Sequence, residues 1–439
     1  MVSGRKWKKV YQKEIKNLRL RSCNTKFHKE CSKLLRDFSY FSYHLKSRFV
    51  TFKNKMRRLF RYILLLSLTL IVIPGCKKDE DSDPGFSSLE EEIDYLVEKY
   101  VKMGAAIWIR DRHQQEQELY VGSISRFNHN PPDEHSIFEI GSITKTFTST
   151  LLAKMVLDGK INLDDTVQSL LPADEVTMPR GTDSVICIRH LATHSSGLPK
   201  VPRDSDQPLP TGYDPYNPYA AYTTEHVYDY LTSWCVLQYE PGSQYFYSNT
   251  GVGLIGHILG LMDGSSYEEL VTNEIFESLG LIETSLFLTP GQLSNLAPGH
   301  NDHLDSVQNY DANDIFQGAG FIKSSLHDMV IYIKTQMGLI QTPLADAIEL
   351  THQSFFDVGG VTYAGCEGYF NLSIGLAWHI HDDSGSGTYY YHGGRTNGYM
   401  AYMSFNVEES TGVVILCNQS YPYAITCFGL ELFDAIHKY

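Results

Sequence analysis

Segments with strand-like composition lie at the two ends of the folded part of this chain, and helical patterns fill the region between them. Residues 105–110 and 117–123 flank a polar connection and predict a hairpin. Residues from about 160 to 310 alternate short helical patterns with loops rich in Pro and Gly. The order predicts an α+β fold in which both ends of the chain share one antiparallel sheet, flanked by helices, with a mostly helical lobe inserted. Four closely spaced strands are expected near the C-terminus, at 372–380, 387–392, 398–407 and 412–418.

Three helices are expected beside this sheet. A capping box at 87–91 begins the first, which ends near Gly104. The second begins at Ser142 and stops near Gly159, and the last covers about 424–437. With 42% hydrophobic and 12% aromatic residues, the chain has enough apolar side chains for a sizeable core.

Charge is distributed unevenly along the chain. The first 78 residues hold 21 of the 37 Lys and Arg residues but only 3 of the 51 Asp and Glu residues. The remaining 361 residues therefore carry 16 basic and 48 acidic side chains, a net charge near −32. Such an acidic body repels phosphate backbones, so nucleic acid is not expected as a partner. No stretch reaches the ~18 apolar residues that a membrane-spanning helix needs.

A secretory signal is predicted at residues 56–76. Met56 and a basic cluster precede a twelve-residue apolar run at 62–73, which is too short to span a membrane. The run ends in Ile-Pro-Gly before Cys76, which resembles the lipobox of bacterial lipoproteins, whose cysteine becomes the lipidated first residue. We therefore expect an exported lipoprotein of the bacterial cell envelope, on the periplasmic face or the cell surface, that contacts the lipid bilayer through an anchor on Cys76. The alternative is an ordinary secretory signal with an incidental cysteine.

The segments on either side of this signal are not expected to belong to the folded body. Residues 77–87 are charged and rich in turn formers, which predicts a flexible tether. Residues 1–55 hold 16 basic residues and no signal of their own. The simplest interpretation is an upstream start-codon error with Met56 as the true start, and a basic nucleic-acid-binding arm is the weaker alternative. The folded domain is then expected over 88–439.

The cysteines do not predict a disulfide framework. Cys23, Cys31 and Cys76 precede the expected domain, and the remaining cysteines are odd in number and irregularly spaced. One pair is possible in an oxidising compartment, and no C-x-x-C zinc pattern is present. The remaining five are Cys187, Cys235, Cys366, Cys417 and Cys427.

A serine and a lysine at helical spacing have the pattern of a nucleophile and its base. Ser142 and Lys145 stand at positions i and i+3 of the second expected helix, so their side chains share one face. A serine hydroxyl needs a base before it can attack, and a desolvated lysine can serve. The helix N-terminus also favours the anion formed during attack. Taken alone, however, S-x-x-K is more often a helix cap followed by a surface lysine.

Two further motifs change that interpretation. The sequence Y-S-N at 247–249 lies about a hundred residues later, and H-G-G-R at 392–395 ends an expected strand. The three motifs follow the order found in serine β-lactamases and penicillin-binding proteins, and the chain resembles this superfamily and its class C β-lactamase-like members. The connecting segments at 188–199 and 318–328 resemble those of the superfamily as well. The resemblance covers roughly residues 90–435.

The resemblance implies a role for each motif residue. Ser142 is expected to be the acylated nucleophile and Lys145 its activating base. Tyr247 is expected to protonate the leaving group and to help activate the deacylating water. Asn249 is expected to orient the substrate and Lys145. His392 is expected to hydrogen-bond around Tyr247 or the substrate.

The third motif also contains a departure from the β-lactamases. The N–H groups of Ser142 and Arg395 match the oxyanion hole, and Gly393, Gly394 and Arg395 are expected to contact the substrate. Where typical β-lactamases of this kind carry Lys, this chain has His392. A neutral histidine holds a substrate carboxylate less firmly than lysine does, and H-x-G is more typical of the superfamily's peptidases, amidases and esterases. By hypothesis, Arg395 supplies the lost positive charge.

The expected function is a serine hydrolase that cleaves an ester or amide bond of a small molecule or peptide through an acyl-enzyme on Ser142. Two alternatives stay open: a β-lactamase or D-Ala-D-Ala carboxypeptidase, and a non-catalytic penicillin-binding-like module. No metal or organic cofactor is expected, and the sequence does not indicate an oligomeric state. His190 and His194 have a spacing that can chelate zinc, but no Glu completes H-E-x-x-H, so structural roles are expected. His379 is expected on a strand face.

Overall fold

The structure is a computed structural model that describes residues 85–203, 209–311, 313–362, 370–383, 387–421 and 424–439. The chain divides after Ser82, and all of the described residues belong to the second unit, Asp83–Tyr439. The expected signal with Cys76, the segment 1–55 and most of the expected tether lie outside the described residues. Within these ranges, no helix combines the length and the apolar character needed to cross a membrane.

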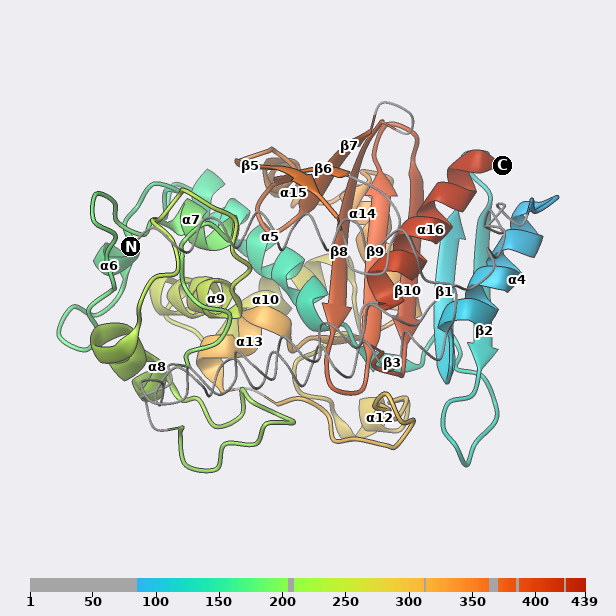
Figure 1. Cartoon of the computed structure of the whole chain (residues 1–439), viewed down its shortest axis with the longest axis horizontal. Coiled ribbons are helices and arrows are strands. Elements are labelled where there is room, and N and C mark those ends of the chain that lie inside the picture. Colours follow the sequence, from blue (N-terminus) through green and yellow to red (C-terminus); the bar gives the residue numbers. More distant parts are fainter. Residues whose placement is uncertain (1–84, 204–208, 312, 363–369, 384–386, 422–423) are drawn as a thin grey trace, which may run out of the picture. The chain divides into compact units, whose positions relative to one another are not determined.

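In the described part of the chain, eight strands form one antiparallel sheet in the order β2-β1-β10-β9-β8-β7-β6-β5 (Figure 1). The first and last strands of the fold are neighbours, with Ala105 opposite Cys417 and Arg110 opposite Gly412. The predicted α+β fold with a shared antiparallel sheet is therefore confirmed. The strands are β1 (Gly104–Arg110), β2 (Glu116–Gly122), β5 (Phe356–Val361), β6 (Phe370–Ile374), β7 (His379–Asp383), β8 (Gly387–Arg395), β9 (Met400–Asn406) and β10 (Thr411–Cys417).

Helices cover both faces of this sheet, and the alternation of strand residues explains why. In β1, Ile107 and Ile109 pack against α4 and α16, whereas Ala106 and Trp108 face the larger core shared with α5 and α14. Figure 1 shows α4 and α16 side by side on one face. The capping Ser88 hydroxyl accepts from the Glu91 N–H, as predicted. These helices are α4 (Leu89–Tyr100), α5 (Thr144–Leu157), α14 (Leu326–Gln336), α15 (Ala345–Thr351) and α16 (Ala424–Lys438).

The expected helical lobe lies beside the sheet. A short separate two-stranded ladder pairs β3 (Ile137–Glu139), before the lobe in sequence, with β4 (Lys323–Ser325), after it. The described residues of 160–310 contribute no strand to the large sheet. The lobe contains α6 (Val167–Leu170), α7 (Ile188–Ala192), α8 (Thr224–Asp229), α9 (Asn249–Asp263), α10 (Tyr267–Val271), α11 (Glu277–Leu279) and α12 (Pro290–Leu293), and α13 (Asp314–Gly320) packs against α9.

The sequence-based description of the sheet is wrong in two places. Residues 372–380 are not one strand, because the chain turns sharply between β6 and β7. In that turn the Gly375 N–H donates to the Trp378 carbonyl at 2.8 Å, and Ala377 has a φ of 64°. Strand β5 is not among the predicted strands, because Gly359 and Gly360 weaken its strand pattern.

The packed domain begins slightly earlier than the predicted start at residue 88. The ring of Phe86 lies 5.1 Å from that of Tyr95, and the Phe86 carbonyl accepts from the Tyr439 hydroxyl at 3.1 Å. The last residues of the expected tether therefore contact the domain.

Candidate active site

Ser142 and Lys145 meet at the start of α5, as predicted from their spacing. Ser142 lies in η1 (Gly141–Ile143), a single 3₁₀ turn that leads into the helix. Lys145 is completely buried, and its Nζ lies 3.0 Å from Ser142 Oγ and also donates to the Ala319 carbonyl. Burial, and then the charge of Lys200, hold the pKa of Lys145 well below its usual value. A neutral amine can accept the serine proton, so this pair can produce a nucleophile.

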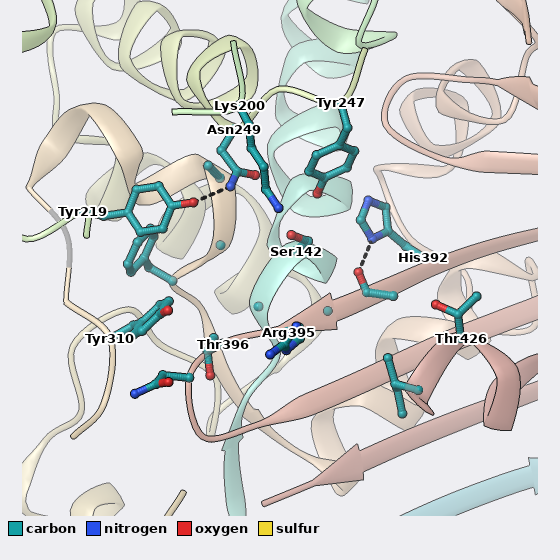
Figure 2. Close-up of a pocket in the computed structure, with 18 of the residues that line it drawn as sticks. Ser142, Lys200, Tyr219, Tyr247, Asn249, Tyr310, His392, Arg395, Thr396 and Thr426 are labelled. Carbon is teal, nitrogen blue, oxygen red and sulfur yellow. Dashed lines mark hydrogen bonds between the residues drawn. The ribbon is translucent and has the colours of Figure 1, made fainter. Parts of the chain in front are cut away.

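Tyr247 lies next to this pair, in the loop before α9. The Nζ atom of Lys145 lies 5.1 Å from the centre of the Tyr247 ring. Figure 2 shows the Tyr247 hydroxyl pointing between Ser142 and His392. Burial raises the pKa of Tyr247, and a hydrogen bond with Ser142 offsets only part of that effect. The phenol therefore stays protonated at neutral pH, which fits a proton donor better than a base.

Two glycines allow the end of β8 to approach the nucleophile closely. A Cβ on Gly394 would lie 1.9 Å from the Ile140 carbonyl oxygen, and a Cβ on Gly141 would lie 2.6 Å from the backbone nitrogen of Arg395. Gly141 also has a φ of 52°, which few other residues tolerate. Only glycine fits at either position, and the close contact places the backbone nitrogen of Arg395 next to Gly141 and that of Ser142 next to Gly394. This arrangement suits an oxyanion hole.

His392 is a buried, neutral hydrogen-bond acceptor. Its Nδ1 lies 2.9 Å from the Gly393 carbonyl, and because a carbonyl can only accept, Nδ1 carries the proton. The other ring nitrogen, Nε2, has no hydrogen-bond partner among the described residues. Burial, and then the charges of His379 and Lys145, hold the pKa of His392 well below its usual value. In this state His392 can accept a hydrogen bond but cannot supply the positive charge of the lysine found in typical β-lactamases.

Asn249 begins α9 and faces the same cleft. Its Nδ2 donates to the Tyr219 hydroxyl at 2.5 Å, and its Oδ1 has no partner in the described part of the chain. The backbone of this segment is fixed by Ser248, whose hydroxyl accepts from the Gly251 N–H at 3.0 Å. The predicted motif residues are therefore brought together by η1, α5, α9 and β8, although they lie up to 250 positions apart.

These residues line a cleft of about 530 Å³. Its two exposed cationic side chains belong to Lys200 and Arg395, and none of the described residues that line it carries a carboxylate. The guanidinium of Arg395 donates from Nε to Ser420 Oγ at 2.9 Å. The lining also includes Gly393, Gly394 and an aromatic wall formed by Tyr219, Tyr310 and Phe321.

The family model for β-lactamases matches residues 89–432. The chain belongs to the β-lactamase family. Curated relatives include the β-lactamase of Pseudomonas fluorescens, 29% identical over 332 residues that cover 70% of this chain and 86% of the relative. Another is the β-lactamase of Escherichia coli, 25% identical over 324 residues that cover 66% of this chain and 78% of the relative.

Solved structures of this family share the fold. A β-lactamase/D-alanine carboxypeptidase from Pseudomonas syringae has a TM-score of 0.64 at 22% identity, with 79% of this chain and 97% of that chain covered. A D-alanine carboxypeptidase from Burkholderia cenocepacia has a TM-score of 0.63 at 21% identity, over 79% and 97% of the two chains. As a member of the β-lactamase family, the chain is a serine hydrolase, as the motifs predict.

The structure of this β-lactamase family member adds two histidines to the site. His194 is fully buried, its Nδ1 accepts from the Ser248 N–H at 3.2 Å, and its ring lies 4.2 Å from that of Tyr247. His379 lies on β7, as the sequence analysis expects, but it also lines the cleft, 5.2 Å from the His392 ring. Its Nε2 lies 3.1 Å from the Tyr245 hydroxyl. His190 instead contacts the Cys187 N–H through Nδ1 at 3.2 Å.

Tyr219 and Lys200 are not among the site residues predicted from the motifs. Both lie in loops, where no periodic pattern signals proximity to the nucleophile. Lys200 directly follows the connecting segment at 188–199, and this position is the one sequence feature that could have indicated its place near the site.

A possible metal-ligating group lies away from the cleft. Glu283, His327 and Asp328 bring their ligand atoms within 4.8 Å of one another, the one such group among the described residues. The buried Asp328 carboxylate already accepts from the Glu283 N–H at 2.7 Å and the Thr284 hydroxyl at 2.8 Å. These bonds give it a structural role at the start of α14.

Proposed function

We propose that this protein hydrolyses an ester or amide bond through an acyl-enzyme on Ser142. Lys145 takes the hydroxyl proton, and Ser142 Oγ attacks the carbonyl carbon of the substrate. The resulting oxyanion accepts hydrogen bonds from the N–H groups of Ser142 and Arg395. Tyr247 then donates a proton to the leaving atom, whose bond to carbon breaks, and it is reprotonated from Lys145. Water attacks the acyl-enzyme by the same route and releases Ser142.

The observation that carries this proposal is the contact between Ser142 Oγ and the buried Lys145 amine, at 3.0 Å. A surface lysine would remain protonated at neutral pH and could not act as a base. Burial favours the neutral form instead.

The neutral His392 supports an ester or peptide substrate over a β-lactam. The relatives named above are called β-lactamases and D-alanine carboxypeptidases, so both activities are alternatives for this chain. At the position where typical β-lactamases carry a lysine, His392 offers a neutral acceptor nitrogen. The cation of this motif is Arg395, three residues later, and its guanidinium donates to Ser420. A non-catalytic binding module is the remaining alternative, and the short contact between Ser142 and Lys145 argues against it.

A burst experiment tests this proposal. A short-chain 4-nitrophenyl ester is mixed with the protein and with its Ser142→Ala variant, and nitrophenolate release is followed in the pre-steady state. We expect a stoichiometric burst from the parent protein alone. Equal release from both proteins would exclude Ser142 as the nucleophile. Parallel assays with a chromogenic cephalosporin and a D-Ala-D-Ala peptide decide between the alternatives, and turnover of either faster than of the ester would reverse our preference.

We also propose that the protein is an exported lipoprotein anchored through Cys76. The signal pattern at 56–76 supports this. Cys427 is disulfide-bonded, and structural disulfides persist mainly in oxidising compartments. The test is expression in a bacterium with labelled palmitate. Label and membrane association should both be lost in a Cys76→Ala variant, and an unlabelled parent protein would refute the anchor.

A further inference from the structure

Lys200 is held in a fixed position by the same helix end that carries the Y-S-N motif. Its backbone carbonyl accepts from the N–H groups of Asn249 at 3.1 Å and Thr250 at 3.3 Å. The preceding carbonyl, that of Pro199, accepts from the Ser248 hydroxyl at 2.9 Å. Three hydrogen bonds thus tie residues 199–200 to the start of α9. The position of Lys200 is therefore coupled to that of the candidate active site.

The Lys200 side chain carries a charge that no described residue neutralises. It lines the cleft, and Figure 2 shows its amine pointing toward Ser142 beside Asn249. Within the described part of the chain, no hydrogen bond or ion pair holds this ammonium group. Desolvation, and then the nearby charge of Arg395, lower the pKa of Lys200. Arg395 differs, because Ser420 already binds its guanidinium.

The position of Lys200 relative to the reacting atoms identifies the part of the substrate that it meets. The leaving atom must lie near the Tyr247 hydroxyl, which donates its proton. In Figure 2, His392 lies on one side of Ser142, whereas Lys200, Asn249 and Tyr219 lie on the other. If the leaving group lies between Tyr247 and His392, the acyl portion extends from the carbonyl carbon to the other side of Ser142, where Lys200 lies. An ammonium without a counter-ion, in a cleft whose described lining has no carboxylate, attracts an anion.

We propose that Lys200 selects substrates with a carboxylate on the acyl portion, on the opposite side of the scissile bond from the leaving group. This inference rests on the proposed acyl-enzyme at Ser142. It makes Lys200 a specificity-determining residue and gives the enzyme a preference for acids over neutral acyl chains. The aromatic wall of Tyr219, Tyr310 and Phe321 provides apolar surface for the methylene groups between the carboxylate and the carbonyl.

Three matched aryl esters test this proposal. The mono-4-nitrophenyl ester of adipic acid carries its carboxylate on the acyl chain, and 4-nitrophenyl hexanoate is its neutral counterpart. The hexanoate ester of 5-hydroxy-2-nitrobenzoic acid carries the carboxylate on the leaving group. The measured quantity is the ratio of kcat/KM between each acid and the neutral ester, in the parent protein and in Lys200→Met, Lys200→Arg and Lys160→Met. Lys160 is the control, because it follows the far end of α5, about 20 Å along the helix from Ser142.

We expect Lys200→Met to lower the adipate ratio about tenfold or more, as the loss of a charged hydrogen bond would. Lys200→Arg should retain most of the preference, and Lys160→Met all of it. The ratio for the leaving-group acid should change much less. An unchanged adipate ratio in Lys200→Met, or an equal fall for both acids, would overturn the assignment.

A binding measurement separates this inference from the proposed function. Calorimetric titration of Ser142→Ala with adipic acid monoanilide and with hexananilide needs no turnover. The acid should bind about tenfold more tightly, and this difference should vanish when Lys200→Met is added. If no ester is hydrolysed but the binding difference is present, the acyl-enzyme proposal fails, and Lys200 is then a carboxylate-binding residue without a role in substrate selection. If hydrolysis occurs without any binding difference, only the Lys200 assignment fails.

Discussion

The Nζ atom of Lys145 lies 3.0 Å from Ser142 Oγ, and the lysine side chain has no exposed surface. This combination makes the amine a base at a pH where exposed lysines are fully charged. Burial contributes most to the lowered pKa, and the neighbouring charge of Lys200 adds to it. The charge of Lys200 therefore affects the pKa of the candidate catalytic base, Lys145.

The pH dependence of acylation should report this coupling. Only the neutral amine accepts a proton, so kcat/KM for a neutral ester should rise with pH and level off well below pH 10.5, the usual lysine value. Removing the Lys200 charge should move this rise in kcat/KM, the basic limb of the profile, to higher pH, because the protonated form of Lys145 is then less disfavoured. The measurement is a pH profile of the parent and of Lys200→Met. A limb near pH 10.5 in the parent would contradict the role of Lys145.

The close approach of β8 to the nucleophile predicts a sharp effect of one methyl group. A Cβ at Gly394 would meet the Ile140 carbonyl at 1.9 Å, so Gly394→Ala must push the strand away and displace an oxyanion donor. We expect kcat to fall about 100-fold or more. At the adjacent Gly393 the nearest atom would be Thr426 Oγ1 at 3.6 Å, so Gly393→Ala should cost far less activity. Similar losses in both variants, with melting curves unchanged, would argue against this geometry.

His194 is expected to position Tyr247 rather than react. Its Nδ1 accepts from the Ser248 N–H, and its ring packs on the Tyr247 ring. His194→Ala should lower kcat about tenfold or more with little change in KM, because it leaves a buried N–H unpaired. His194→Asn should restore part of the loss, since asparagine has an acceptor oxygen and tolerates the φ of 56° at this position. Equal activity in the two variants would count against a positioning role.

Buried histidines should make the fold sensitive to acid. Burial lowers the pKa of His352 to about 3, so the folded state keeps it neutral while the unfolded chain binds a proton below about pH 6.5. The free energy of unfolding should therefore decrease as the pH is lowered from about 6.5 to about 3, by up to about 1.4 kcal/mol per pH unit from this residue. Urea titrations at several pH values should show a shallower fall in His352→Gln than in the exposed control His303→Gln. Identical slopes would mean that His352 does not contribute.

Local patterns predicted most of the fold because its elements follow simple periodicities. The alternation in β1, the capping of α4 by Ser88 and the i, i+3 spacing of Ser142 and Lys145 depend on neighbours in the chain. The split between β6 and β7 was missed, because the turn at Gly375 to Trp378 is apolar and carries no proline or polar turn signal. β5 was missed because its two glycines weaken the strand pattern.

The sequence by itself determined the fold class, the three motifs and the order in which they occur. Only the tertiary structure decided which state each residue adopts: a buried Lys145, an acceptor His392, and a Lys200 beside Asn249 that has no counter-ion among the described residues. The physical reason is that protonation and charge depend on desolvation and on neighbours distant in the chain. Those neighbours are set when β8, η1 and α9 pack together.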